Sequence, residues 1–355
     1  MKAKPRKFTF LHKRPRITDV AELAGVSVAT VSVVVNDRVG EQIRVSPEVQ
    51  QKVWAAVTEL GYVANPVAQS LAGGWNKIIA VFTFEPIFPI DSRNFYHPFL
   101  VGIEEAAADN GIDLLLVTGS TQTDHGRHIY QKGINRLQRA DGAILLGHGN
   151  REEVVRLLEE KYPFVFVGRR ESPQDNISYV AADYAAATVQ LVEHLLQHDH
   201  RRLAYIRSTR ATEASTDRER AVRQALAPVQ LPDNWLWSGN PHQLTQTVLS
   251  DYLAKGFTAF VVEDDELGQH LLSLAAELNL QCPRDFSLVV LGNPLSPLIE
   301  VPDWTSFNIP RREMGREALK ILLELLATHP DENRAPQRKV LECTLKLGSS
   351  VRKAI

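Results

Sequence analysis

The chain has 355 residues, more than one hydrophobic core normally serves, so we expect at least two domains. Residues 1–77 hold 11 basic and 6 acidic side chains, a net charge of +5, whereas residues 78–355 carry a net charge of −7. Nucleic acid is therefore expected as a partner of the first part only. Two cysteines, Cys282 and Cys343, exclude a disulfide framework. No stretch suits a membrane span or a signal peptide, so the sequence predicts a soluble, cytoplasmic protein.

Residues 1–16 form a basic tail with seven positive side chains and no acidic one: Lys2, Lys4, Arg6, Lys7, Lys13, Arg14 and Arg16. Such a segment is predicted to be disordered, and its simplest interpretation is a solvated arm. Next to a DNA-binding module it would add contacts to phosphates and steepen the dependence of binding on salt.

Residues 17–63 have the pattern of a helix-turn-helix. Thr18 is the expected N-cap of the first helix, with Asp19 in its first turn. One face of this helix is apolar, with Val20, Leu23 and Ala24. Gly25 can supply the left-handed conformation of a tight turn. Two short helices joined by such a turn fit the major groove of DNA.

The next two helices also have clear ends. Ser27 is the expected N-cap of a helix over residues 28–35, which Asn36 can close. Ser46, Pro47 and Glu48 are expected to begin a third helix that ends at Gly61. Its predicted apolar stripe consists of Val49, Val53, Trp54, Val57 and Leu60.

Residues 64–77 form a predicted hinge. Asn65 and Pro66 repeat the combination of cap and proline, and residues 67–71 form one amphipathic turn. Five residues cannot form a stable helix alone, so something else must fold this turn.

These segments together resemble the LacI/GalR family of transcriptional regulators. The matching residues, with unbroken spacing, are Ile17 to Ala21, Ala24 to Ser27, Ala29 to Ser32, Asn36, Val45, Ser46, Val53, Ala56, Leu60 to Tyr62, Asn65 and Ala68 to Leu71. Three small amphipathic helices often only pack on one another, but this spacing favours DNA binding.

The resemblance implies a role for each part of the segment. Val28 and Ala29 would meet base edges, and Ser27, Thr30 and Ser32 would meet phosphates. The position of Val33 usually carries a polar or basic side chain in the family, so one contact is expected to be missing. Leu71 would enter the minor groove as an apolar wedge, although an ordinary linker contact is the alternative. The remaining expected DNA-binding residues are Thr18, Asn36, Asn65, Ala68 and Gln69.

From residue 78 onward, apolar runs alternate with helical patterns. Strands are predicted at residues 78–82, 114–117, 143–146, 164–167, 203–206, 259–262 and 288–291, and helices at 99–110 and 129–137. This alternation predicts two parallel sheets with right-handed crossovers.

The resemblance extends over the same region and implies a core similar to periplasmic sugar-binding proteins. One lobe would span about 78–180 and 310–338, and the other about 181–309 and 339–355. The residues that carry this part of the resemblance are Gly102 to Glu104, Asp141, Gly142, His194 to Leu196, His200 to Arg202, Pro283 to Asp285 and Gly315.

Ligands of parallel sheets bind beyond the carboxyl ends of the strands, which in a two-lobed protein is the cleft. The resemblance places effector contacts at Asp183 and Arg218, which would suit a sugar or a sugar acid. Glu263 and Asp264 stand where the family has an Asn-Asp pair, and Gly292 stands where an aspartate is usual. A solvated helix start is an equal explanation of the acidic cluster. Phe95 could stack on a ligand ring or belong to the core.

No metal, cofactor or catalytic group is expected. His194, His198 and His200 belong to a helix end rather than to a metal site, and no nucleophile has a usable context. Three hypotheses remain: a DNA-binding regulator that senses a small molecule, a solute-binding transport protein with the same core, and an enzyme. The resemblance favours the first, acting as a homodimer on a pseudo-palindromic operator.

Overall fold

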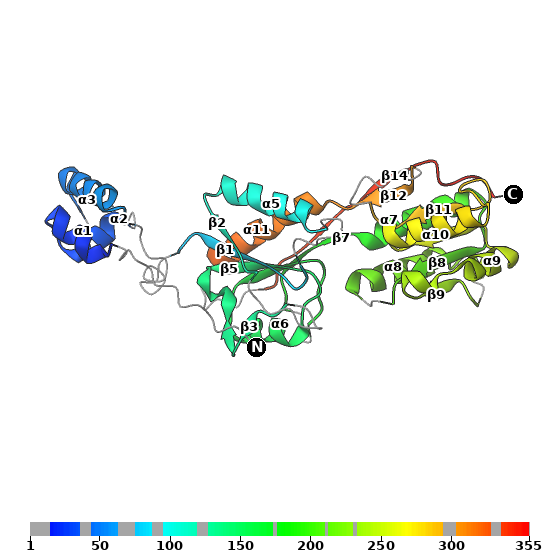
Figure 1. Cartoon of the computed structure of the whole chain (residues 1–355), viewed down its shortest axis with the longest axis horizontal. Coiled ribbons are helices and arrows are strands. Elements are labelled where there is room, and N and C mark those ends of the chain that lie inside the picture. The colour runs from blue at the N-terminus through cyan, green and yellow to red at the C-terminus, as the bar shows by residue number, and fades with distance from the viewer. Residues whose placement is uncertain are drawn as a thin grey trace, which may run out of the picture. The chain divides into compact units, whose positions relative to one another are not determined.

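The computed structural model describes residues 15–35, 44–62, 75–86, 95–118, 127–172, 176–209, 212–229, 233–293, 303–327 and 335–354. The chain forms two compact units, Met1–Asn76 and Lys77–Ile355 (Figure 1). We call the described residues 15–62 of the first unit the headpiece and the second unit the core domain, and each is described by itself.

The headpiece contains three helices, α1 (Ile17–Ala24), α2 (Val28–Val35) and α3 (Pro47–Leu60). Small side chains fill its core: Val20, Ala21, Ala24, Val31, Val34, Val53 and Ala56. The predicted helix-turn-helix and third helix are confirmed. Because the buried groups are small, the three helices can approach one another closely.

Local hydrogen bonds fix the helix ends. The Ser27 hydroxyl accepts from the amide of Thr30 at 3.1 Å, and the Ser46 hydroxyl accepts from the amide of Val49 at 3.4 Å. Gly25 and Gly61 end α1 and α3 with φ of 66° and 60°. The predicted caps Ser27 and Ser46 and the predicted glycine ends Gly25 and Gly61 are confirmed.

Three details of the headpiece prediction are wrong. Arg16, not Thr18, is the N-cap of α1, because its amide donates to the Asp19 carboxylate at 2.7 Å. Leu23 and Trp54 are 47% and 49% exposed, so neither belongs to the apolar face that packs inward. Valine and alanine already fill the small space between the helices, which leaves no room for larger side chains.

Within the described residues, no single helix is long and apolar enough to cross a membrane; α1 and α2 reach that limit only when taken together, across a bend of 105°.

The first lobe of the core domain is built on a parallel sheet in the order β13-β7-β6-β5-β1-β2. Its strands are β1 (Ile78–Thr83), β2 (Asp113–Leu116), β5 (Gly142–Leu146), β6 (Phe164–Val167), β7 (Tyr179–Ala182) and β13 (Arg338–Leu341). Helices α5 (His97–Asp109) and α11 (Arg311–Ala327) contribute to the buried cluster on one side of the sheet, and α6 (Arg151–Glu159) to the cluster on the other.

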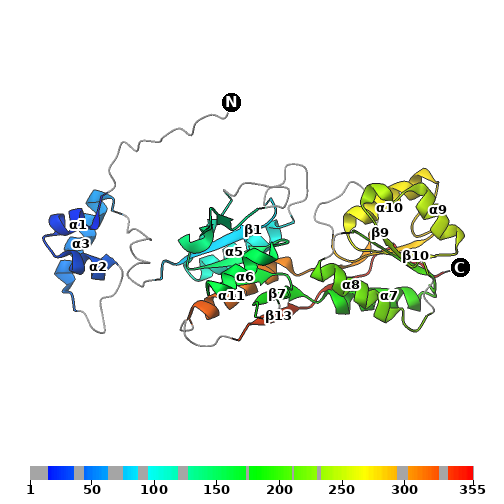
Figure 2. The ribbon, with the colours of Figure 1, turned by 90° about the horizontal axis from the view of Figure 1, so that it is seen from below.

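The second lobe repeats this plan in the order β14-β12-β11-β10-β8-β9, with only β14 antiparallel. Its strands are β8 (Leu203–Arg207), β9 (Leu236–Ser238), β10 (Ala259–Val262), β11 (Ser287–Val290), β12 (Thr305–Asn308) and β14 (Thr344–Lys346). Figure 2 shows α7 (Tyr184–Gln197) and α8 (Glu213–Ala225) on one face and α9 (Gln246–Ala254) and α10 (Asp265–Glu277) on the other. The predicted pair of parallel sheets is confirmed.

The chain passes between the lobes after β7, after β12 and after β13. β13 pairs with β7 up to the register Leu341 with Ala182, so both strands belong wholly to the first lobe. The expected boundaries after residues 180 and 338 therefore come too early, because the pairing of the two backbones continues to the ends of the strands.

The helix predicted over residues 129–137 is wrong. The segment forms a hairpin of β3 (Tyr130–Gln131) and β4 (Ile134–Asn135), followed by a short 3₁₀ helix, Arg136–Arg139. Lys132 and Gly133 connect the two strands with φ of 52° and 79°. Positive φ at both central residues is the requirement of a two-residue hairpin turn, and it outweighs the helical spacing of the apolar residues.

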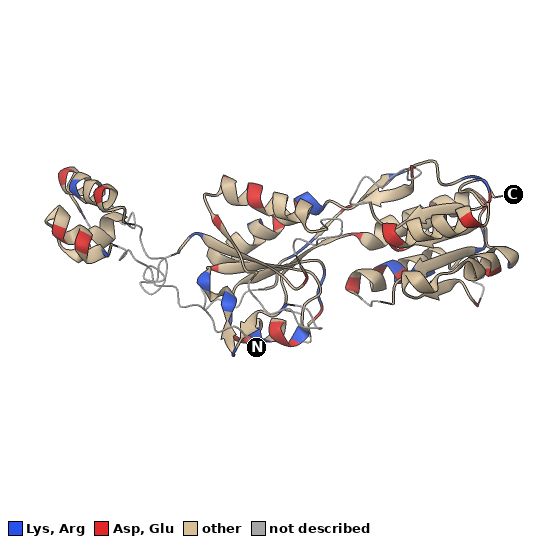
Figure 3. Cartoon of the chain, in the orientation of Figure 1, with Lys and Arg blue, Asp and Glu red and all other residues tan. Residues whose placement is uncertain are grey.

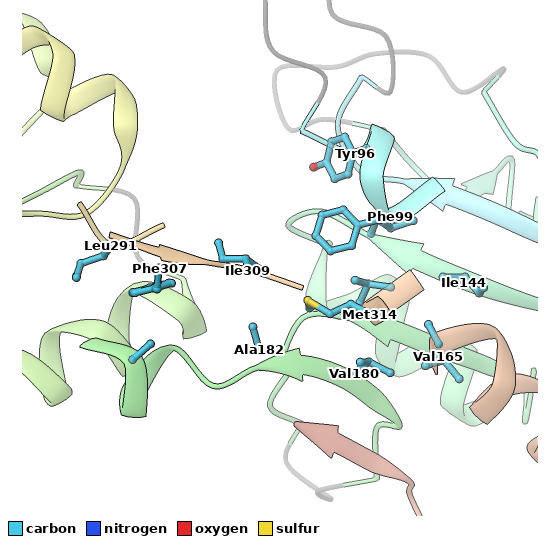
Figure 4. Close-up of a cluster of buried hydrophobic side chains, with 14 of the residues drawn as sticks. Tyr96, Phe99, Ile144, Val165, Val180, Ala182, Leu291, Phe307, Ile309 and Met314 are labelled. Carbon is cyan, nitrogen blue, oxygen red and sulfur yellow. The ribbon is translucent and has the colours of Figure 1, made fainter. Parts of the chain in front are cut away.

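A continuous apolar cluster joins the two lobes. Figure 4 shows Phe99 and Met314 on the side of the first lobe, Phe307 and Leu291 on the side of the second, and Ile309 and Ala182 between them. α5 and α11 approach closely within the first lobe, since a Cβ at Gly315 would lie 2.2 Å from the carbonyl oxygen of Phe99. The two lobes are thus joined by a tightly packed apolar cluster.

Candidate DNA interface and effector cleft

The beginning of α2 is the exposed part of the headpiece that suits a groove of DNA. Val28 is 42% exposed and Ser27 and Ala29 are also exposed, while Val31 and Val34 are buried on the opposite face. The hydroxyls of Ser27 and Thr30 lie 2.8 Å apart. The first turn of α2 therefore presents small hydroxyls and apolar groups outward, as its predicted role requires.

A shallow groove of about 510 Å³ runs along this turn of α2 and the start of α3. Ala29, Thr30 and Val33 line one side of it, and Arg44 and Ser46 line the other. The sequence reasoning did not select Arg44. Its position just before the Ser46 cap was the available signal, because a basic side chain beside a capped helix start is well placed to contact a phosphate.

The folded headpiece is not basic. Its described residues, 15–35 and 44–62, contain 3 basic and 4 acidic side chains, and acidic residues are visible on α1 and α3 (Figure 3). The positive charge of the first unit therefore comes from residues 1–14, which hold six basic side chains. Thr18 is exposed on α1 and Ser32 is partly buried on α2. Asn36, Asn65, Ala68, Gln69, Leu71 and most of the basic tail lie outside the described residues.

In the core domain, Glu263 follows β10 at the carboxyl end of the second sheet. It is only 6% exposed, and its Oε2 accepts from the amide of Ser208 at 3.0 Å. Its Oε1 is buried and accepts no hydrogen bond from the described residues. Such an oxygen is costly to bury unless a ligand or a water donates to it.

Asp264 has a different role from its neighbour. Its carboxylate accepts from the amide of Leu267 at 2.8 Å and caps α10. Burial raises the pKa of Asp264 to about 6, and the nearby Glu263, Asp265 and Glu266 add to the rise. Asp264 therefore lies at a helix start, but it is largely buried rather than solvated, and a ligand contact by Glu263 or Asp264 stays a prediction.

Asp183 is also a helix cap. Its carboxylate accepts from the amide of Ala186 at 2.9 Å, and its own amide donates to the carbonyl of Leu341 at 2.8 Å. The residue lies where the chain passes from the first lobe to the second. One of its oxygens thus has a structural partner, and a contact to an effector stays a prediction.

Arg218 on α8 lies next to buried aromatic residues. Its guanidinium is 4.1 Å from the centre of the Tyr184 ring, and its Nε is buried without a partner among the described residues. Tyr205, fully buried on β8, has a hydroxyl that is likewise unpartnered. Burial raises the pKa of Tyr205, and the charge of Glu263 raises it further. Arg218, Tyr205 and Glu263 therefore form one polar group in the second lobe.

Arg311, the first residue of α11, was not among the predicted site residues. It is 6% exposed, and its Nη1 donates to the side-chain oxygen of Asn293 at 2.7 Å. Its guanidinium lies 5.3 Å from the centre of the Phe95 ring. Phe95 is 42% exposed and packs against Tyr96 and Phe99, so it is a partly open aromatic surface rather than a core residue.

Gly292 has a backbone conformation that explains the missing aspartate. Its φ is 151°, which L-amino acids rarely adopt, and a Cβ would lie 3.4 Å from Cδ1 of Ile309. An aspartate at this position would therefore be strained in this backbone conformation.

Two arginines after β6 connect the lobes across the cleft. Arg169 forms two hydrogen bonds with the Asp217 carboxylate, each at 2.8 Å, and Arg170 lies 3.2 Å from the Glu213 carboxylate. A pocket of about 370 Å³ beside them has walls from both lobes, including His148, Phe166, Ile177, Thr212 and Thr216. The sequence reasoning missed this pair, although its place after a parallel strand was a usable signal.

Within the described parts of the chain, no three histidine, cysteine or acidic side chains gather in a way that could hold a metal ion.

Known proteins match both units. Residues 16–65 match bacterial regulatory proteins of the lacI family, and residues 192–351 match a periplasmic binding protein-like domain. The HTH-type transcriptional regulator CelR of Thermobifida fusca is 28% identical over 345 residues, which cover 95% of this chain and 98% of CelR. The HTH-type transcriptional repressor PurR of Aliivibrio fischeri (strain MJ11) is 25% identical and covers 90% of this chain and 94% of its own.

Solved structures agree with these matches. A complex of the transcriptional regulator CelR with cellobiose has a TM-score of 0.64 at 28% identity. The match covers 95% of this chain and 100% of the CelR chain. The lac repressor dimer bound to operator and the anti-inducer ONPF has a TM-score of 0.71 at 21% identity, covers 96% of this chain and 100% of its own, and so shares the fold. The chain therefore combines a helix-turn-helix domain of the lacI family with a periplasmic-binding-protein-like domain, and the relatives that it matches over nearly their full length are DNA-binding transcriptional regulators.

Proposed function

We propose that this chain is a repressor that binds a pseudo-palindromic operator as a homodimer. Its affinity for the operator changes when a small molecule, a sugar or sugar derivative, binds in the interlobe cleft. One observation carries the proposal: the same chain has an exposed, capped helix start suited to a DNA groove and a cleft with buried polar atoms that lack partners among the described residues.

On the DNA side, the exposed face of α2 supports contacts by Ser27, Val28, Ala29 and Thr30. Val28 can contact a thymine methyl group, and Ala29 offers little more. Direct reading of bases by these two residues is therefore sparse. The proposed wedge at Leu71 would add specificity through the deformability of the DNA rather than through hydrogen bonds.

On the effector side, the cleft offers what a carbohydrate needs. Tyr184 and Phe95 supply aromatic faces, Arg218 supplies donors, and Glu263 supplies an acceptor. The relative CelR has been solved with cellobiose, and that supports a carbohydrate for this chain as well.

Coupling between the two sites would depend on the three passages between the lobes. A ligand held by both lobes changes their relative orientation, and β1 of the first lobe follows directly after the hinge. In a dimer, such a change alters the distance between the two hinges and thus the ability of both headpieces to reach one operator.

The other two hypotheses have less support. A transport protein with this core has no use for a helix-turn-helix headpiece, and the relatives of this chain are transcriptional regulators. The polar groups of the cleft have the composition of a binding site, and we infer that it carries out no catalysis.

The test begins with selection of duplexes from a randomised library by the full-length protein at low salt. We expect enrichment of a two-fold symmetric site, with sedimentation of the free protein as a dimer. Ala29→Glu should lower affinity for that site by about 100-fold, because a carboxylate in the groove faces phosphates and base acceptors. Gln51→Glu is the matched control, since it adds the same charge on the exposed side of α3. A protein that enriches no duplex at low salt, or loses no affinity with Ala29→Glu, contradicts the proposal.

A further inference from the structure

Two arginines in the cleft have no carboxylate partner among the described residues. Three neighbouring arginines do have one: Arg169 pairs with Asp217, Arg170 with Glu213 and Arg207 with Glu219. Arg218, by contrast, lies against the Tyr184 ring, and Arg311 contacts the neutral side chain of Asn293 and the Phe95 ring. The cleft thus holds two positive charges that the described protein does not neutralise by contact.

Arg311 is the more unusual of the two because it is almost fully buried. With 6% of its surface exposed, its Nε has no hydrogen-bond partner in the described part of the chain. Burial is the main cause that lowers the pKa of Arg311, and the positive charge of Arg218 also lowers it, whereas Tyr184 and Asp265 act in the opposite direction. A charged group in this situation is unfavourable unless a counter-charge arrives with a ligand.

The guanidiniums of Arg218 and Arg311 lie in the same part of the cleft. Arg218 lies 4.1 Å from the centre of the Tyr184 ring, whose own centre is 6.4 Å from that of Phe307 on β12. Arg311 follows the end of β12 by three residues, and the charge of Arg218 acts on it. Two guanidiniums that share one neighbourhood can bind a single carboxylate or phosphate, whose several oxygens match their planar donors.

Acceptors complete the site. Glu263 Oε1 and the hydroxyl of Tyr205 are buried and have no partner among the described residues, and the charges of Glu263 and Arg218 both act on Tyr205. An ionised carboxylate can only accept, so its partner must carry an O–H or N–H. A ligand that satisfies all these groups combines a negative group with at least one hydroxyl.

We propose that the effector is an acidic carbohydrate, with its negative group bound between Arg218 and Arg311 and a hydroxyl donated to Glu263. This inference rests on the proposed function and narrows its effector from any sugar to an anionic one. A carboxylate and a phosphate share the required chemistry. The alternative is that buried water satisfies these atoms and the arginines have a purely structural role.

The experiment uses the full-length protein and matched pairs of compounds at constant ionic strength. Thermal shift and calorimetry compare D-glucuronate and D-glucose 6-phosphate with D-glucose, D-gluconate with D-glucitol, and inorganic phosphate and acetate with buffer alone. We expect anions to raise the melting temperature while their neutral counterparts do not. The glucuronate and 6-phosphate arms distinguish a sugar acid from a phosphate ester.

Variants then locate the bound anion. Arg311→Gln should weaken the best anion by at least about 10-fold, and Arg311→Lys should weaken it less because the charge remains. Arg316→Gln on the same helix is the matched control and should change nothing, since Arg316 pairs with Glu105 and Asp109 instead. If Arg311→Gln fails to fold by circular dichroism, Arg218→Gln gives the same test from α8, with exposed Arg220→Gln as its control.

Three results would overturn the inference: no anion in the panel stabilises the wild-type protein beyond its neutral partner, a neutral sugar binds as tightly as its acid, or anion binding survives both Arg311→Gln and Arg218→Gln. None of these three results affects the test of operator binding by duplex selection. A protein that binds its operator and responds to a neutral sugar would keep the proposed function and lose only this inference.

Discussion

The headpiece and the interlobe cleft are both binding surfaces, yet they are built in opposite ways. The first turn of α2 is complete without a partner: its hydroxyls bond locally and its apolar groups rest on a small core. The cleft is incomplete, because Arg218, Arg311 and Glu263 each bury a polar atom that has no described partner. We therefore expect the first turn of α2 to recognise the shape of its partner. The unpartnered polar atoms of the cleft, by contrast, determine which chemical groups a ligand must carry.

The distribution of charge follows the same division. The described residues 15–35 and 44–62 hold more acidic than basic side chains, so they contribute little electrostatic attraction to DNA. Residues 1–14 hold six basic side chains, and the cleft holds two arginines without carboxylate partners among the described residues. Affinity for DNA and specificity for the operator are therefore expected to reside in different segments of the first unit.

The largest expected effect concerns the packing beneath the cleft. Gly315→Ala would place a methyl group 2.2 Å from the carbonyl oxygen of Phe99, where α5 and α11 approach too closely for any side chain. Forcing the helices apart should destabilise the core domain by about 3 kcal/mol. Thermal unfolding followed by circular dichroism measures it, with exposed Lys320→Ala as the control. Equal stability of Gly315→Ala and wild type would show that the base of the cleft is not rigid.

The next effect separates affinity from specificity in the headpiece. Deleting residues 2–14 should lower operator affinity by about 100-fold at about 0.1 M salt and flatten the dependence of log K on log salt by up to about 5, because six cations are lost. Preference among operator sequences should persist. Fluorescence anisotropy across a salt series measures both, and a chain with the six residues changed to glutamine controls for length. An unchanged salt slope would place the attraction elsewhere.

The same division explains what the sequence could and could not predict. Caps and glycine ends are encoded within a few residues, so Ser27, Ser46, Gly25 and Gly61 were predicted correctly. The hairpin at residues 130–135 was missed because apolar spacing was given more weight than the turn formed by Lys132 and Gly133.

The cleft depends on residues far apart in the chain. Asp183, Arg218, Glu263 and Asp264 could be named only through a family resemblance, and the structure shows that Asp183 and Asp264 cap helices. No local sequence pattern around Arg311 or Tyr205 indicates a binding site. Their significance comes from burial without a described partner, which depends on how segments far apart in the chain pack together.

A smaller effect tests whether the acidic cluster has a stability cost of its own. The pKa of Asp264 is about 6 in the folded protein, above its ordinary value of 3.8, so the folded state holds its proton more firmly than the unfolded chain does. Stability due to this group is present below about pH 4 and is lost as the pH rises to about 6. Asp264→Asn keeps a cap and removes that loss, and should be more stable than wild type by about 2 kcal/mol at about pH 8. Urea unfolding at about pH 4 and about pH 8 tests this, with equal stabilities expected at the lower pH.

The smallest effect concerns the ion pair between the lobes. Arg169 and Asp217 are 24% and 19% exposed and form two hydrogen bonds, so their coupling should be about 1 kcal/mol at low salt and less at high salt. A double-mutant cycle with Arg169→Met and Asp217→Asn measures this coupling in the ligand-free protein. Arg223→Met, on the exposed side of α8, is the control, since its pair with Glu219 lies within one helix.

If the pair holds the lobes together, breaking it weakens ligand binding as well as stability, because the cleft then spends more time open. Loss of stability with unchanged binding of the anions would mean that the ion pair fastens α8 without controlling closure. The cleft would then need its ligand's charge, held by Arg218 and Arg311, as the main force that draws the lobes together. The headpiece has no comparable dependence, since the described contacts that order α2 lie within its own small core.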